Sequence, residues 1–231
     1  MRGAIFHILI CFLLVAVSAT ANAESWCQPK VTPTINVKTD TNRIKWVFNK
    51  SQKDLNQKDI DTVNPYGNSV ITDVGGLMHG GIKMQQRMEF GTLTNPNVNE
   101  TCMFYNSVDA SFHIYPTIYI AREYPQGSCM HNAIRAHELQ HVNIDRQIVN
   151  KYALLVGNAI KSEINRQFTY GPVPSSNRNA IQAQMRQRME GILRQHSTAM
   201  DAERRKLQQD LDSLSEYERV NHLCDGNVKR Y

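Results

Sequence analysis

The sequence predicts an α+β protein, in which an N-terminal antiparallel β-sheet is followed by a long antiparallel helical hairpin. Two observations lead to this fold class. Before about residue 130, short stretches of alternating apolar and polar residues are separated by turns rich in glycine and proline. From Ala133 to Phe168 there is no proline and one glycine, Gly157, so this stretch is expected to be a continuous helix.

Residues 1–23 have the features of a secretory signal peptide. Arg2 supplies a positive charge, residues 8–17 are apolar, and Ala21-Asn22-Ala23 is a small-residue cleavage site. Cleavage near Ala23 leaves residues 24–231 as a single domain, with a β-rich part (24–130) and a helical part (131–231). We therefore expect a secreted or periplasmic protein, with no transmembrane segment in the mature chain.

The charge of the mature chain does not predict nucleic-acid binding. Removal of residues 1–23 leaves 25 Lys and Arg against 21 Asp and Glu, a net charge of +4. The basic clusters at 186–188 and 204–206 lie among glutamates, as on a solvated helix face.

Four cysteines remain after cleavage: Cys27, Cys102, Cys129 and Cys224. An even number in an exported chain predicts two disulfides, with three possible pairings. Cys102 and Cys129 bracket a strand-rich stretch, which favours that pair, with Cys27–Cys224 joining the two ends. Thiolate metal ligands are the alternative, but the chain has no Cys-x-x-Cys pair.

The expected strands lie in three places. Residues 28–48 alternate between apolar and polar, and glycine pairs at 75–76 and 80–81 mark turns. The clearest strand lies in SFHIYPTIYIAREY (111–124), where Pro116 predicts either an edge position or a break.

The helical part reads as two helices joined by a turn over 170–177. The first covers 133–168 and the second runs from about Arg178 to Leu223. Ser213 and Glu216 have capping-box spacing, so a new helix could start within 212–220.

The segment AHELQHVNID (136–145) contains the pattern H-E-x-x-H on the first predicted helix. His137 and His141 project from the same helix face, where both imidazoles can reach one zinc ion. Glu138 lies one position further round the helix and could accept a proton from water bound to that zinc. Chance produces this pattern in about one chain of this size per hundred. The sequence therefore predicts one Zn²⁺ per chain, with Glu138 as general base.

In zincins, the zinc peptidases with this motif, the active-site helix commonly follows the edge strand that binds the peptide. Residues 114–120 precede the motif at a suitable distance and could take a peptide as an added strand. An ordinary core strand is the alternative for this segment.

A third metal ligand is expected on the returning helix. Asp145 lies about 12 Å along the helix from His137, so it is expected to support the site or to lie on the surface. Reflection about the turn near 172 places residues 203–207 level with the histidines. Glu203 and Asp210 fall on the apolar stripe of this helix, and helical phase favours Glu203.

Glu216 is the remaining candidate for the third ligand. Helix capping is the alternative role for this residue. If Glu216 binds the metal, the neighbouring Tyr217 could stabilise an oxyanion with its phenol.

An exported chain with a β-rich start and the segment AHELQHVNID resembles a little-characterised family of bacterial secreted zinc-dependent proteases. The resemblance implies a zincin-like fold and peptidase activity on a peptide or protein substrate. It carries the metal ligands over to His137 and His141 and the general base to Glu138.

The resemblance extends to a late aspartate–aromatic segment. In the family, an Asp is followed by a hydroxyl residue three positions on and a His five positions on. Asp212 and Ser215 match this pattern, but Tyr217 replaces the histidine. The role of this segment therefore stays open.

Together these features predict an exported zinc metallopeptidase that hydrolyses peptide bonds. One alternative is a non-catalytic metal-binding envelope module, in which the helical hairpin docks a partner. Another is a cell-wall amidase, which uses similar metal chemistry on a different substrate.

Overall fold

The computed structural model describes residues 25–58, 62–64, 67 and 73–224, so the predicted signal peptide lies outside the described residues. The strands are β1 (Thr34–Thr41), β2 (Lys45–Val47), β3 (Gly76–His79), β4 (Ile82–Asn95), β5 (Glu100–Ile114), β6 (Thr117–Ile120) and β7 (Thr169–Pro174). The helices are α1 (Gln52–Leu55), α2 (Cys129–Arg166), α3 (Arg178–Leu211) and α4 (Leu214–His222), with 3-10 turns η1 (Ser25–Cys27) and η2 (Ser175–Asn177).

The main sheet is built on the long β4–β5 hairpin. Its strand order is β1-β5-β4, and β7 also pairs with β5. β4 and β7 run antiparallel to β5, whereas β1 runs parallel to it, from Thr34 opposite Ser107 to Thr41 opposite Ile114. The prediction of an antiparallel sheet is therefore confirmed for β4, β5 and β7 but wrong for β1. A parallel pair needs a long crossover connection, and the chain between β1 and β5 provides one.

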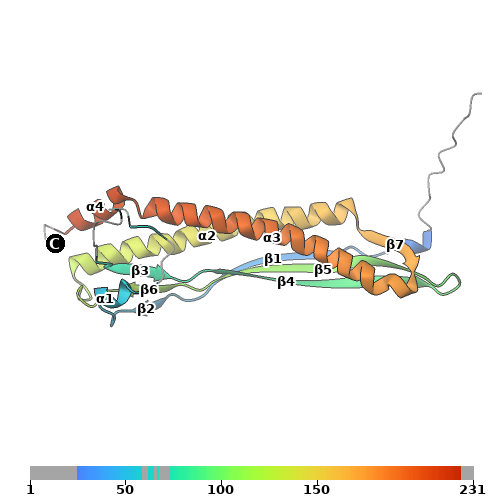
Figure 1. Ribbon diagram of the computed structural model, residues 1–231, viewed down its shortest axis with the longest axis horizontal. Coiled ribbons are helices and arrows are strands. Elements are labelled where there is room, and N and C mark those ends of the chain that lie inside the picture. Colours follow the sequence, from blue (N-terminus) through green and yellow to red (C-terminus); the bar gives the residue numbers. More distant parts are fainter. Residues whose placement is uncertain (1–24, 59–61, 65–66, 68–72, 225–231) are drawn as a thin grey trace, which may run out of the picture.

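A smaller sheet with the order β2-β6-β3 lies at one end of the molecule (Figure 1). Pro116 separates β5 from β6, so of its two predicted roles, an edge position or a break, it has the second. β6 is the middle strand, and its Ile118 and Ile120 side chains are fully buried. Of the two alternatives for this segment, β6 is therefore the core strand and not a peptide-binding edge strand, because both of its edges are already paired.

Gly76 allows β3 to pack closely against α2. A Cβ atom at this position would lie 2.3 Å from Ile134 Cγ2 and 2.7 Å from Glu138 Oε1. The glycine pair at 75–76 therefore serves this close approach and not the turn that the sequence predicted, since Gly76 is the first residue of β3.

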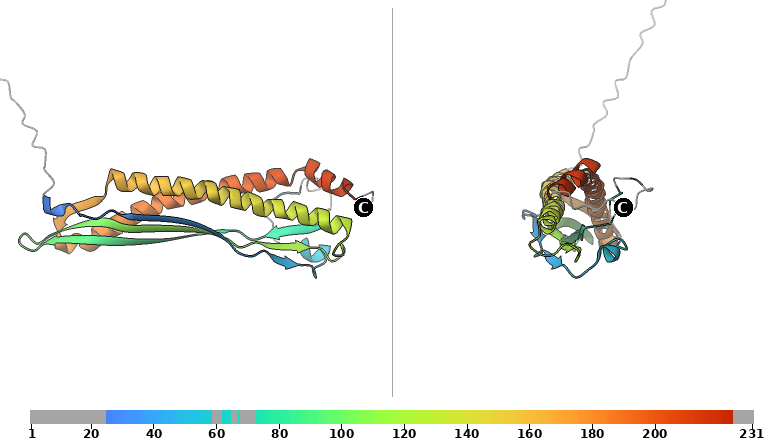
Figure 2. Two further views of the ribbon diagram at one scale, coloured as in Figure 1. Left: turned by 180° about the vertical axis from the view of Figure 1, so that it is seen from behind. Right: turned by 90° about the vertical axis from the view of Figure 1, so that its left-hand side faces the viewer.

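The helical part forms the predicted antiparallel hairpin. α2 and α3 lie along one face of the main sheet and make the molecule elongated, as Figure 2 shows from behind and from one end. α2 has 38 residues, a length of roughly 57 Å at 1.5 Å per residue. β7 and η2 occupy the predicted turn between the helices.

α2 spans two hydrophobic clusters. The larger cluster fills the space between the main sheet and the two long helices, and it includes Phe112, Ile148 and Met189. The smaller cluster packs the small sheet against the first half of α2, through Ile118, Ile120, Ile134 and Val142. Because one rigid helix belongs to both clusters, it holds the small sheet in a defined position relative to the main sheet.

All four predicted cysteines form disulfides, but the favoured pairing was wrong. The bonds are Cys27–Cys102 and Cys129–Cys224. Cys129 is the first residue of α2, and Cys224 follows α4 at the same end of the molecule. Disulfides are typical of extracellular and periplasmic proteins.

None of the helices in the described ranges combines the length and the apolar character needed to cross a membrane.

Glu163 connects the two long helices far from the H-E-x-x-H motif. Its buried carboxylate accepts hydrogen bonds from Arg166 on α2 and Arg188 on α3. Burial alone would raise the pKa of Glu163, but the hydrogen bonds from the two arginines outweigh burial and hold this pKa below its usual range. A carboxyl with a lowered pKa stabilises the fold above its unfolded-state pKa, and this contribution is lost as the pH falls.

The variant Glu163→Gln should therefore unfold more easily than the wild type at pH 7, by about 1–2 kcal/mol. The difference should shrink between pH 5 and pH 3, because the wild-type carboxyl then becomes protonated. Urea denaturation at several pH values measures both effects. A difference that does not change with pH would show that the ion pair is not its cause.

Candidate metal centre

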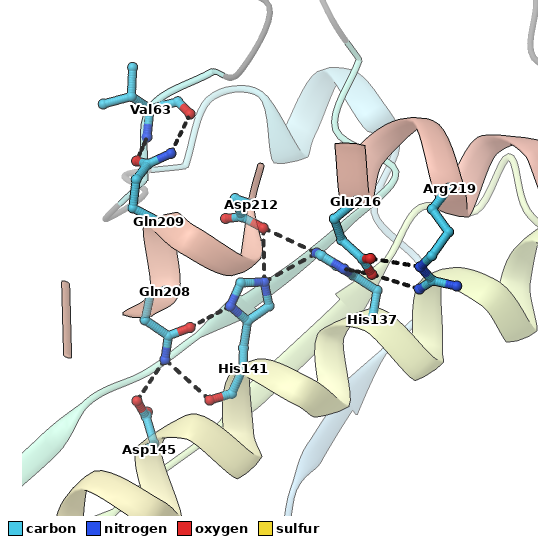
Figure 3. A network of polar contacts seen from close by, with 9 residues as sticks. All are labelled: Val63, His137, His141, Asp145, Gln208, Gln209, Asp212, Glu216 and Arg219. Atoms are coloured by element: carbon cyan, nitrogen blue, oxygen red, sulfur yellow. Dashed lines mark hydrogen bonds and ion pairs between the residues drawn. The ribbon is translucent and has the colours of Figure 1, made fainter. Parts of the chain in front are cut away.

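Three buried ligand atoms meet between the first half of α2 and the junction of α3 with α4 (Figure 3). Asp212 Oδ1 lies 3.1 Å from His137 Nε2 and 3.1 Å from His141 Nε2. The two Nε2 atoms are 3.2 Å apart. The three side chains are between 8% and 10% exposed, so they are largely shielded from solvent.

The spacing of these atoms fits a tetrahedral zinc site. Zinc binds nitrogen and oxygen at about 2.0–2.2 Å, so neighbouring ligand atoms in a tetrahedron lie roughly 3.3 Å apart. The observed triangle of ligand atoms, at 3.1–3.2 Å, is close to this value.

Glu216 determines which nitrogen of His137 faces this point. His137 Nδ1 lies 3.2 Å from Glu216 Oε1, and the carboxylate also accepts two hydrogen bonds of 2.6 Å from Arg219. The hydrogen bonds from Arg219, opposed by burial and assisted by His137, hold the pKa of Glu216 below its usual range. An ionised carboxylate only accepts hydrogen bonds, so Nδ1 of His137 carries the proton and donates it.

Gln208 determines which nitrogen of His141 faces the same point. Its Oε1 atom contacts His141 Nδ1, while its Nε2 donates to the His141 carbonyl oxygen at 3.1 Å and to Asp145 Oδ1 at 2.7 Å. His141 Nδ1 therefore donates to the amide oxygen. When both rings are neutral, each Nε2 atom carries a lone pair that points at Asp212 Oδ1. Two lone pairs and a carboxylate oxygen repel one another at this distance, so a cation between the three atoms would stabilise them.

The charges around the site favour positive charge at this point. Burial alone would lower the pKa of His141, but the hydrogen bond to Asp212 and the charge of Glu138 outweigh it and raise the pKa to about 9. The same balance raises the pKa of His137. For Asp212, burial would raise the pKa, but hydrogen bonds to both histidines hold it well below its ordinary value. Protons or a metal ion can supply the charge, and metal binding displaces protons.

Glu138 lies between α2 and the small sheet. Its side chain is buried, 4% exposed, and burial raises its pKa. The Met78 N–H of β3 donates a hydrogen bond to this carboxylate. The close approach at Gly76 brings the strand near enough for this contact.

The late segment surrounds His137 and Asp212. The Tyr217 ring lies edge-on to His137, with ring centroids 6.1 Å apart. Ser215 hydrogen-bonds to Ser213 at the start of α4. Ser213 is the N-cap residue, but its side chain does not cap the helix, so Glu216 serves His137 and Arg219 instead of a capping box.

Residues between α1 and β3 also contact the centre. Thr62 donates a hydrogen bond to Asp212. The Gln209 side chain binds the Val63 backbone at two atoms, accepting from its N–H at 2.6 Å and donating to its carbonyl oxygen at 3.3 Å.

The structure brings Asp212 to the two histidines, and not the favoured Glu203. Glu203 binds Lys151 at 2.6 Å and Tyr152 at 3.1 Å, and Asp210 pairs with Lys206. Glu216 reaches the centre, but at His137 Nδ1 and not at the point where the ligand atoms meet.

The difference between the predicted and the observed carboxylate at the histidines has a simple cause. Reflection about residue 172 predicts residue 203 opposite His141, but Gln208 takes that place. The chain passes through β7 and η2 before α3 begins, and this shifts the register of the second helix.

Asp212 entered the sequence analysis only through the family resemblance, and Gln208 was missed. A signal for both was present. Met200 is buried on α3, and steps of four residues from it reach Arg204, Gln208 and Asp212, which are buried as well. A polar continuation of an apolar helix stripe indicates a buried polar site.

The variant Asp212→Asn should bind zinc at least about 100-fold more weakly than the wild type, because it loses a charged ligand. Glu203→Gln and Asp210→Asn should bind zinc as the wild type does. Competition with a chromophoric chelator on the oxidised mature chain measures all three. Wild-type affinity in Asp212→Asn would exclude this residue as a ligand.

No protein-family model, curated protein or solved structure matches this chain. The resemblance to bacterial secreted zinc-dependent proteases therefore stays a prediction from its residues. The proposed function therefore rests on the geometry of the candidate metal centre.

Proposed function

We propose that the protein is an exported zinc-dependent peptidase with one zinc ion per chain. The observation that carries this proposal is the meeting of His137, His141 and Asp212 at one buried point. Three protein ligands are typical of catalytic zinc sites, whereas structural sites have four. The two disulfides and the predicted signal peptide support export.

The residues of the centre have two proposed roles, binding the metal and transferring protons. His137, His141 and Asp212 would hold the ion. When bound, zinc would lower the pKa of water and polarise the scissile carbonyl. Glu138 would accept a proton from the attacking water and pass it to the leaving amine. The hydrogen bond from Met78 N–H keeps its carboxylate in place for this task.

Tyr217 is the proposed oxyanion donor. Its ring lies beside His137, on the α4 side of the centre. A phenol hydroxyl near the metal could donate a hydrogen bond to the oxygen that becomes negative when a peptide carbonyl is attacked.

The alternatives use the same ligands. A metal-binding module without turnover has no need of a buried carboxylate beside the ligands, so the position of Glu138 argues against it. A cell-wall amidase would need the same base, and only its substrate would differ.

The variant Glu138→Gln should keep wild-type zinc content and lose at least about 100-fold in kcat, because the amide cannot accept the proton. Metal analysis and hydrolysis of a fluorogenic peptide library measure the two properties. Glu203→Gln is the matched control, and it should keep both. Unchanged turnover in Glu138→Gln would exclude its role as the base. Zinc-loaded wild type that cleaves peptidoglycan fragments but no peptide would identify an amidase.

The variant Tyr217→Phe should lower kcat by about 100-fold, with a small change in KM, because the hydroxyl is needed only when charge develops. Steady-state kinetics on the best peptide of the same library measures this. A change confined to KM would instead indicate that Tyr217 binds substrate.

A further inference from the structure

Gln208 lies at the centre of a buried chain of polar contacts. Its side chain is on α3 and is 2% exposed. The chain runs from Arg204 through the Asp145 carboxylate to the Gln208 amide and on to the His141 ring (Figure 3 shows the last three). It therefore connects the packing of the two long helices to one of the metal ligands.

The orientation of the amide follows from its neighbours. Asp145 is fully buried and accepts a hydrogen bond of 2.7 Å from Arg204 Nε. The Asp145 carboxylate is paired with Arg204 and faces the NH₂ group of Gln208, which also donates to the His141 carbonyl oxygen. The amide oxygen must then face His141 Nδ1. A reversed amide would place its NH₂ group against the N–H of the ring and its oxygen against a carboxylate.

We propose that Gln208, oriented by Asp145, is a positioning residue that fixes His141 in the state that binds metal. By accepting the proton of Nδ1, the amide keeps the lone pair on Nε2, which faces His137 and Asp212. It also holds the plane of the ring, because the contact is directional. This inference rests on the proposed zinc site and adds to it the residues that prepare one ligand.

Helix packing alone does not account for an amide at this position. Elsewhere on the same face, α3 uses Met185, Met189 and Leu193, which are buried without polar contacts to satisfy. A buried amide is costly unless every polar atom has a partner. Here the partners of the Gln208 amide are Asp145 and His141, which belong to the same series of polar contacts.

Two substitutions separate positioning from packing. Gln208→Met keeps the approximate size and removes the acceptor for His141 Nδ1. Gln208→Glu keeps an acceptor oxygen, but it places a second carboxyl against Asp145. Glu163→Gln is the control, since it removes a buried polar contact between the same helices, roughly 33 Å along α2 from His141.

The measurements are the zinc dissociation constant, by chelator competition, and the free energy of unfolding without zinc. Gln208→Met should bind zinc about 10–100-fold more weakly than the wild type. Gln208→Glu should bind zinc more tightly than Gln208→Met although it unfolds more easily. Glu163→Gln should lose stability and keep zinc affinity.

Other outcomes would overturn the inference. If zinc affinity follows stability across the three variants, Gln208 acts through packing, and the proposed peptidase is unaffected. If the wild type binds no zinc, both the inference and the proposed function fail. Nitrogen-15 NMR of zinc-loaded wild type provides a test that needs no variant. It should show His141 bound through Nε2 with a protected Nδ1–H, and binding through Nδ1 would overturn the inference.

Discussion

The buried carboxylate of Asp145 holds α2 and α3 in register beside the candidate metal centre. It binds Arg204 and Gln208, which lie four residues apart on α3, and Asp212 follows after four more. One face of one helix therefore sets the register and also brings Asp212 to the two histidines. A slip of one turn between the helices would separate Asp212 from both histidines and leave a buried charge without its partner.

The position at which α3 ends also determines which residues reach the histidines. The chain turns at Asp212 and Ser213, and α4 then brings Glu216 and Tyr217 round to His137. The Cys129–Cys224 disulfide joins the segment after α4 to the start of α2. The two parts of the chain that carry the candidate ligands are therefore covalently linked.

The two sheets support different halves of α2. The main sheet packs on its apolar second half, where the ion pairs of Glu163 join the helices. The small sheet packs on the first half and places β3 against Glu138. As a result, three carboxylates, those of Glu138, Asp212 and Glu216, surround two imidazoles at one end of an otherwise ordinary core. Glu138 and Asp212 are buried, and protons on the imidazoles or a metal ion can balance their charge.

The sequence by itself determined the features that depend on local pattern: the β-rich start, the two long helices, and the placement of His137 and His141 on one helix face. These follow from the spacing of residues within one element. Only the tertiary structure decided the parallel strand β1, the disulfide pairing, and the choice of Asp212 over Glu203. Each of these joins segments far apart in the chain. Helical phase states which face a residue occupies, but its partner across the interface depends on the path of the connection. Here β7 and η2 displace α3 along α2. As a result, Asp212 and not Glu203 lies at the two histidines.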